Sequence, residues 1–166
     1  MIFSKRSQAW GIDLMVAIGI FSVAIVVFFV YSMNQTNEAR DTLEDLLYDG
    51  KTISNSLLSE GSPKDWNSDN VIKLGILDEG KINNTKLERF YDLSLSDYAR
   101  TKTLFKIRTD YYFFLDEEMI IDGEDVVGIG KPGFDIEDID EENIIKIKRF
   151  VIYNDKPVNA YFYVWR

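Results

Sequence analysis

Few side chains in this sequence offer the chemistry of an active site. The 166 residues include no histidine and no cysteine, so the commonest general base, the commonest metal ligand and the thiolate nucleophile are all missing. Serines and carboxylates are numerous, but none stands in a pattern typical of catalysis. We therefore expect a protein that is not an enzyme and that needs no cofactor.

The densest set of potential metal ligands is the acidic run over residues 135–142. It reads Asp-Ile-Glu-Asp-Ile-Asp-Glu-Glu and offers carboxylate oxygens, which calcium prefers. Its spacing is not that of an EF-hand, so we interpret it as a solvated acidic segment and expect no metal site. The glycines of residues 128–133 lack the spacing of a phosphate-binding loop and predict a turn.

Asp13 is the carboxylate in the most unusual setting. It precedes an uncharged, proline-free run from Leu14 to Tyr31. With the apolar residues at its margins, this run has the length of about 20 residues with which a helix crosses a bilayer. A carboxylate at the edge of such a helix is costly. It is stabilised either by the positive helix N-terminus in the headgroup zone or by a partner.

The charges around the apolar run predict its orientation. Lys5 and Arg6 precede the run and acidic residues follow it, so we expect the N-terminus in the cytoplasm and the C-terminal head outside the cell membrane. No Ala-x-Ala motif follows, so removal of the whole segment as an ordinary secretory signal is not expected. The net charge of −9 disfavours nucleic acid as a partner.

The segment from Lys5 to Gln8, followed by Asp13 and the apolar run, resembles the N-terminus of archaeal type IV pilin-like proteins, which carry a class III signal peptide. The resemblance implies that a prepilin peptidase cuts between Ser7 and Gln8, directly behind Arg6 and Ser7. It also implies that Asp13 pairs with the new N-terminal amine of a neighbouring subunit. Ser7 stands where Gly or Ala is usual in the family. Asp13 would be the sixth mature residue, whereas the family's acid is commonly the fifth.

This resemblance implies a structural subunit of a type IV pilus-like surface filament, assembled by packing of N-terminal apolar helices. Its partners would be copies of itself or related pilins, the prepilin peptidase and the membrane. The alternative is a single-pass membrane-anchored protein whose head binds a partner or serves a secretion complex without polymerising. The mass of the mature N-terminus distinguishes the two.

The predicted organisation has four parts: a basic leader over residues 1–7, a membrane-spanning or filament-core helix over 8–33, a stalk helix over 34–62 and a head over 63–166. In the stalk, apolar residues recur at helical spacing. Gly50 suggests a bend within the stalk. The apolar residues are Leu43, Leu46, Leu47, Ile53, Leu57 and Leu58.

The head is expected to contain short helices first and strands last, which predicts an α+β fold with a small antiparallel sheet packed on the helix. Ser94 and Asp97 form a capping-box pattern before the second short helix. Asp122-Gly123 and Asn154-Asp155 predict hairpin turns. Residues 111–114, Tyr-Tyr-Phe-Phe, are interpreted as strand core. The alternation in the last strand predicts a sheet covered on both faces.

Two sequons offer sites for N-linked glycans outside the membrane. They are Asn34-Gln35-Thr36 and Asn83-Asn84-Thr85. Asn34 directly follows the apolar run, where the bilayer restricts access. Asn83 is therefore the better candidate.

Overall fold

The computed structural model describes residues 6–134 and 144–166, and it describes the side chains of the first helix except those of residues 6–10 and 34–39. The chain divides into two compact units, Met1–Thr42 and Leu43–Arg166. The acidic run over residues 135–142 lies outside the described residues.

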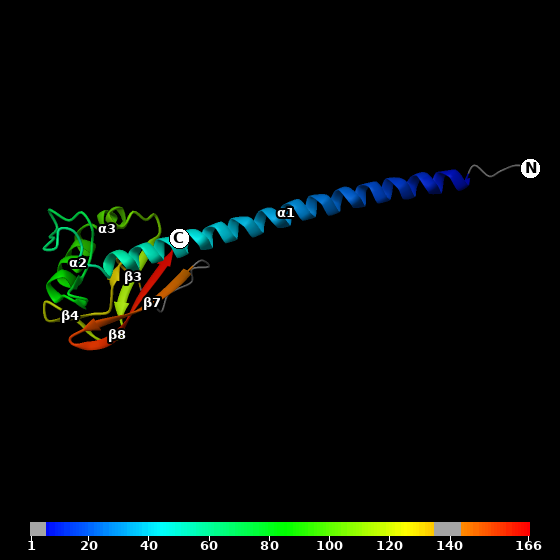
Figure 1. Cartoon of the computed structure of the whole chain (residues 1–166). Helices are drawn as coiled ribbons and strands as arrows, with labels where there is room; N and C mark the ends of the chain where they lie inside the picture. The colour runs from blue at the N-terminus through cyan, green and yellow to red at the C-terminus, as the bar shows by residue number, and fades with distance from the viewer. Residues whose placement is uncertain (1–5, 135–143) are drawn as a thin grey trace, which may run out of the picture. The chain divides into compact units, whose positions relative to one another are not determined.

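The N-terminal helix α1 extends over Arg6–Leu57 and is drawn from blue to cyan in Figure 1. The expected long N-terminal helix is therefore confirmed. It ends at Leu57, before the expected end at residue 62, and Gly61 follows with a left-handed φ of 79°. Of the apolar residues predicted to line the stalk, Leu46, Ile53 and Leu57 are buried in the second unit, whereas Leu43 and Leu47 are exposed.

Gly50 has a packing role where the sequence suggested a bend. The residues on both sides of it are helical. A Cβ atom at position 50 would lie 2.6 Å from Cδ1 of Ile147 and 3.4 Å from Cγ2 of Val164. The missing side chain thus lets the sheet approach the helix closely, which offsets the low helix propensity of glycine.

Two short helices follow, α2 (Asn84–Ser96) and α3 (Tyr98–Phe105). The side chain of Asn83 caps α2 by accepting a hydrogen bond from the amide of Lys86. Asp97 caps α3 by accepting from the amide of Arg100. Ser94 is not the cap that the capping-box pattern suggested. It lies buried near the end of α2, where its hydroxyl donates to the carbonyl of Gly130.

The second unit contains a curled mixed sheet of six strands in the order β1-β2-β7-β8-β3-β6. The α+β class is thereby confirmed. The strands are β1 (Leu77–Asp78), β2 (Lys81–Ile82), β3 (Asp110–Leu115), β6 (Ile129–Gly130), β7 (Ile144–Tyr153) and β8 (Lys156–Trp165). A separate hairpin joins β4 (Met119–Ile121) to β5 (Glu124–Val126).

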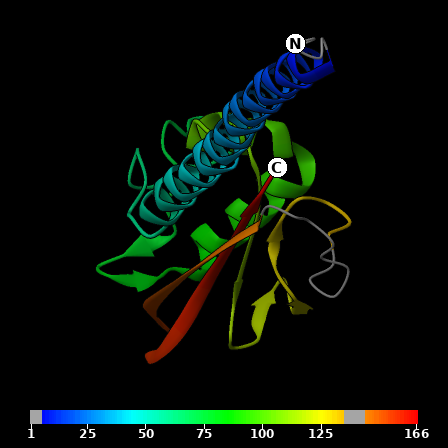
Figure 2. The same cartoon turned by 90° about the vertical axis from the view of Figure 1, so that its right-hand side faces the viewer.

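The sheet is not antiparallel throughout, because β2 pairs parallel with β7 through Lys81 and Ile152. The long strands β7 and β8 form the expected C-terminal hairpin and run side by side in Figure 2. Asn154 and Asp155 close it with φ values of 49° and 60°, as a two-residue hairpin turn requires. Asp122-Gly123 likewise closes the β4–β5 hairpin, with φ values of 51° and 83°.

One face of the sheet forms the hydrophobic core with the last turns of α1, α2 and α3. Phe113 of β3 is fully buried there, with its ring centroid 5.1 Å from that of Phe162 and 6.4 Å from that of Phe90. On the opposite face Trp165 and Tyr112 are buried, whereas Tyr161 and Tyr163 of β8 are partly exposed. The expectation that both faces are covered therefore holds for part of the second face.

Candidate functional site

Residues Gly11–Met33 of α1 form a helix that is long and apolar enough to cross a membrane. The segment has 23 residues and a mean hydropathy of 2.8, and no other part of the described chain covers it. Such a length matches the hydrocarbon core of a bilayer. A helix of this kind close to the N-terminus is typical of a membrane anchor or a secretion signal.

Asp13 lies near the start of this apolar segment and is exposed. Among the described residues, no hydrogen bond or ion pair to its carboxylate is found. Ala17, one helical turn further, offers no polar group to it.

The predicted processing residues Arg6, Ser7 and Gln8 lie in the first turn of α1, and their side chains are outside the description. Asn34 also lies in α1, directly after the apolar segment. Cleavage and glycosylation at these positions stay predictions.

Asn83, the other predicted glycan site, lies at the N-terminus of α2. Its Oδ1 atom accepts from the amide of Lys86 at 3.1 Å. The residue is half-buried and lines an open cleft of about 560 Å³. This hydrogen bond uses the side-chain oxygen of Asn83. A glycan is attached to the side-chain nitrogen, which the hydrogen bond does not use. The structure therefore keeps Asn83 geometrically compatible with modification.

No group of three or more metal-ligating side chains occurs among the residues described in ranges 6–134 and 144–166. The aromatic run of β3 divides between the two faces of the sheet. Tyr111 and Phe113 lie in the core as predicted, whereas Tyr112 and Phe114 lie on the opposite face.

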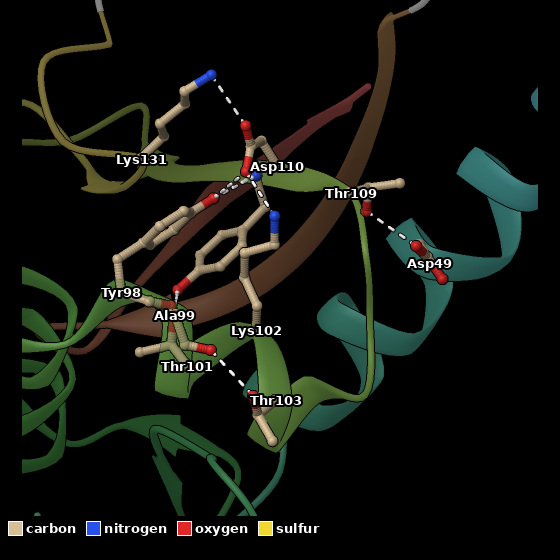
Figure 3. A network of polar contacts seen from close by, with 10 residues as sticks. Asp49, Tyr98, Ala99, Thr101, Lys102, Thr103, Thr109, Asp110 and Lys131 are labelled. Carbon is tan, nitrogen blue, oxygen red and sulfur yellow. Dashed lines mark hydrogen bonds and ion pairs between the residues drawn. The ribbon is translucent and has the colours of Figure 1, made fainter.

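A polar network around Asp110 was not apparent from the sequence. Its carboxylate accepts from Lys102 Nζ at 2.7 Å on one oxygen and pairs with Lys131 Nζ at 2.9 Å on the other. The hydroxyl of Tyr98 donates to Asp110 and accepts from the amide of Tyr111 (Figure 3). These contacts join α3, the start of β3 and the residue after β6. Sequence reasoning missed them because the four side chains come from three separate elements.

The electrostatics of this network fix the charge of Asp110. Burial alone would raise the pKa of the carboxyl group, but hydrogen bonds from Lys102 and Lys131 outweigh it and hold the pKa below its ordinary value. Burial also raises the pKa of the Tyr98 hydroxyl, so this group stays a neutral donor. Both carboxylate oxygens of Asp110 are paired with lysines, so the network links α3, β3 and the residue after β6. We call this network the Asp110 tie.

Protonation of Asp110 at low pH should weaken the Asp110 tie. Because the pKa of Asp110 is lower in the folded than in the unfolded state, its contribution is complete well above pH 4 and is lost as pH falls through the folded pKa. Asp110→Asn should lower the free energy of unfolding by about 1–2 kcal/mol at pH 7 and by less near pH 2. Denaturant titrations at both pH values measure this.

Asp155→Asn is the matched control. Asp155 pairs with Lys81 at 2.6 Å, but its side chain is 83% exposed. Solvent screens that pair, so its loss should have little effect at either pH. An equal effect of both substitutions would show that the partial burial of Asp110 is unimportant.

The partly covered face of the sheet carries a continuous set of aromatic rings, which we call the aromatic row. Phe114 stacks against Tyr161 and Tyr163 at centroid distances of 5.0 and 5.6 Å. Lys146 Nζ lies 4.4 Å from the ring centroid of Tyr161. The members of the row are Tyr112, Phe114, Phe134, Tyr161, Tyr163 and Trp165. The alternation of aromatic residues along β8 is visible in the sequence. The stacking of Phe114 on Tyr161 and Tyr163 is not, because it depends on the pairing of β3 with β8.

Comparison of the chain with protein-family models, with curated proteins and with solved structures found no match.

Proposed function

We propose that this protein is a structural subunit of an archaeal type IV pilus-like surface filament. The observation that supports it most is the uncovered apolar segment Gly11–Met33, joined to an α+β unit. In this proposal the apolar helices of many copies pack together, and each head stays outside the cell membrane. Leaving such a surface in water would be strongly unfavourable, so it requires either lipid or other helices.

Asp13 gives the proposed packing a defined register. In an apolar helix bundle an unpaired carboxylate costs several kcal/mol, and pairing with the cleaved N-terminus of a neighbour offsets that cost. Copies shifted along the bundle axis would lose the pair. The carboxylate thus disfavours wrong registers rather than adding general stability.

A second candidate is a single-pass anchored protein that binds a partner through its head and does not polymerise. The partly exposed rings of Tyr161 and Tyr163 in the aromatic row favour it, because aromatic side chains are enriched at binding surfaces. In this case the apolar helix would be an anchor only.

Mass spectrometry of the mature chain tests the filament role. We expect the chain recovered from sheared surface filaments to begin at Gln8, which requires cleavage behind Ser7. An intact Met1 in a chain that stays wholly in the membrane fraction would contradict the filament role and support the anchor. Replacing both Lys5 and Arg6 with alanine should block cleavage and filament formation together, and it serves as the uncleaved control.

A further inference from the structure

A cavity of about 260 Å³ lies at the β6 edge of the sheet. Its lining includes Tyr91 and Leu95 of α2 and Val127, which follows β5. Leu95 is 61% exposed and Val127 is 75% exposed, so two apolar side chains stand uncovered at its rim. A cavity of about 150 Å³ already accepts a benzene ring. This cavity is therefore large enough for an aromatic side chain.

The rim of the cavity is acidic. Glu124 and Asp125 belong to its lining. Lys131 also lines it, but the ammonium group of that lysine pairs with Asp110. Polar groups thus form the larger part of the lining, with two carboxylates among them and the apolar side chains of Leu95 and Val127 exposed beside them. Such a site suits an aromatic ring that has cations next to it.

Phe150 offers the aromatic ring and the nearby cations that this cavity would accept. It lies on β7 with its side chain 79% exposed. The ammonium group of Lys148 is 5.4 Å from the centroid of its ring. Lys146 precedes Lys148 on the same face of β7, with its ammonium group over the rings of Tyr161 and Tyr163. Phe150 is therefore an exposed aromatic side chain with two cations on one side of it along the strand, in a protein of net charge −9.

The two features cannot meet within one chain. β7 and β6 are separated in the sheet by β8 and β3. Three strand spacings amount to about 14 Å, which exceeds the reach of a phenylalanine side chain. If Phe150 fills this cavity, it must therefore belong to a second copy. A contact between different surfaces of identical copies is heterologous, and such contacts propagate instead of closing as a dimer.

We propose that Phe150 of one copy docks in the cavity between α2 and β6 of the next copy, with Lys146 and Lys148 facing Glu124 and Asp125. This contact rests on the proposed filament role and adds a connection between heads to the packing of the helices. Each copy would place its Phe150 in one neighbour and accept the Phe150 of another neighbour in its own cavity. The heads would therefore all point the same way along the assembly.

Cysteine cross-linking tests the contact. The natural chain has no cysteine, so an introduced pair reacts alone. The full chain carrying both Ile152→Cys and Val127→Cys keeps Phe150 in place, since Ile152 is 39% exposed and lies beside Phe150 on the same face of β7. It is oxidised in the filament and membrane fractions and examined on a non-reducing gel. We expect a ladder of dimers, trimers and higher multimers. Its yield should exceed at least tenfold that of the matched pair Ile152→Cys and Ile72→Cys, since Ile72 is as exposed (74%) as Val127 and does not line the cavity.

The outcomes separate this contact from the filament role. Equal yields from the two pairs would overturn the contact, whether or not filaments form. Efficient dimers from Ile152→Cys alone, without higher multimers, would also overturn it, because they indicate a symmetric contact. Absence of filaments together with an intact Met1 would reject the filament role. The docking contact would then be tested by the multimer ladder from the membrane fraction alone.

A charge exchange gives a second, independent measurement. Replacing both Lys146 and Lys148 with glutamate in the cross-linking pair should lower the multimer yield at least threefold. Adding Glu124→Lys and Asp125→Lys to the same chain should restore it. Failure of restoration, with each variant folded by its circular dichroism spectrum, would exclude the charge complementarity on which the docking depends.

Discussion

Asp13→Ala is expected to abolish filament assembly while leaving the protein inserted in the membrane. The substitution makes the apolar segment more hydrophobic, so insertion should not suffer. In the proposed filament it removes the partner of the neighbouring amine, and that positive charge would remain unpaired among apolar helices. Breaking a buried pair in this way costs about 3–5 kcal/mol at each contact, which is enough to prevent a repeating assembly.

The measurement counts filaments by electron microscopy and follows insertion by resistance to carbonate extraction. Asp13→Glu is the conservative control, because it keeps the carboxylate and should retain some filaments. Normal filaments in Asp13→Ala would show that the carboxylate has no role in register and serves only the headgroup zone. Loss of membrane insertion would show that the residue matters earlier, during export.

Phe113→Ala should be the most damaging single change in the head. Phe113 is fully buried in β3 and lies among the aromatic rings of Phe90 and Phe162. Truncating such a ring removes its hydrophobic contribution and leaves a cavity, at a cost of about 3–5 kcal/mol. A domain stable by about 5–15 kcal/mol would lose much of its stability. Denaturant unfolding of the detergent-solubilised chain, followed by the fluorescence of the buried Trp66 and Trp165, measures the change.

Phe150→Ala is the matched control for this experiment. It removes the same side chain from an exposed site on β7, so the free energy of unfolding should change by no more than about 0.5 kcal/mol. A small effect of Phe113→Ala would indicate that the head does not fold around the core described above. The contrast between the two phenylalanines separates stability from the proposed docking.

Features set by neighbouring residues were predictable. The turns at Asp122-Gly123 and Asn154-Asp155 need a left-handed φ at adjacent positions, and these residue types adopt it readily. The capping-box pattern of Ser94 and Asp97 predicted the position of α3 but not its cap. Asp97 is the cap in the structure, since Ser94 belongs to the end of α2 and hydrogen-bonds the main chain of Gly130. A long-range contact thus determines the role of Ser94, and the local pattern does not contain it.

The sequence by itself determined the apolar helix, the order of helices and strands and the hairpin turns, because each depends on the spacing or conformation of residues close together in the chain. Only the tertiary structure decided the parallel pairing of β2 with β7, the close approach at Gly50 and the Asp110 tie. It also decided that Phe150 lies on a central strand, with β8 and β3 between it and the β6 edge where the cavity lies. The physical reason is that strand order and register join residues far apart in the chain, and no local pattern encodes that pairing.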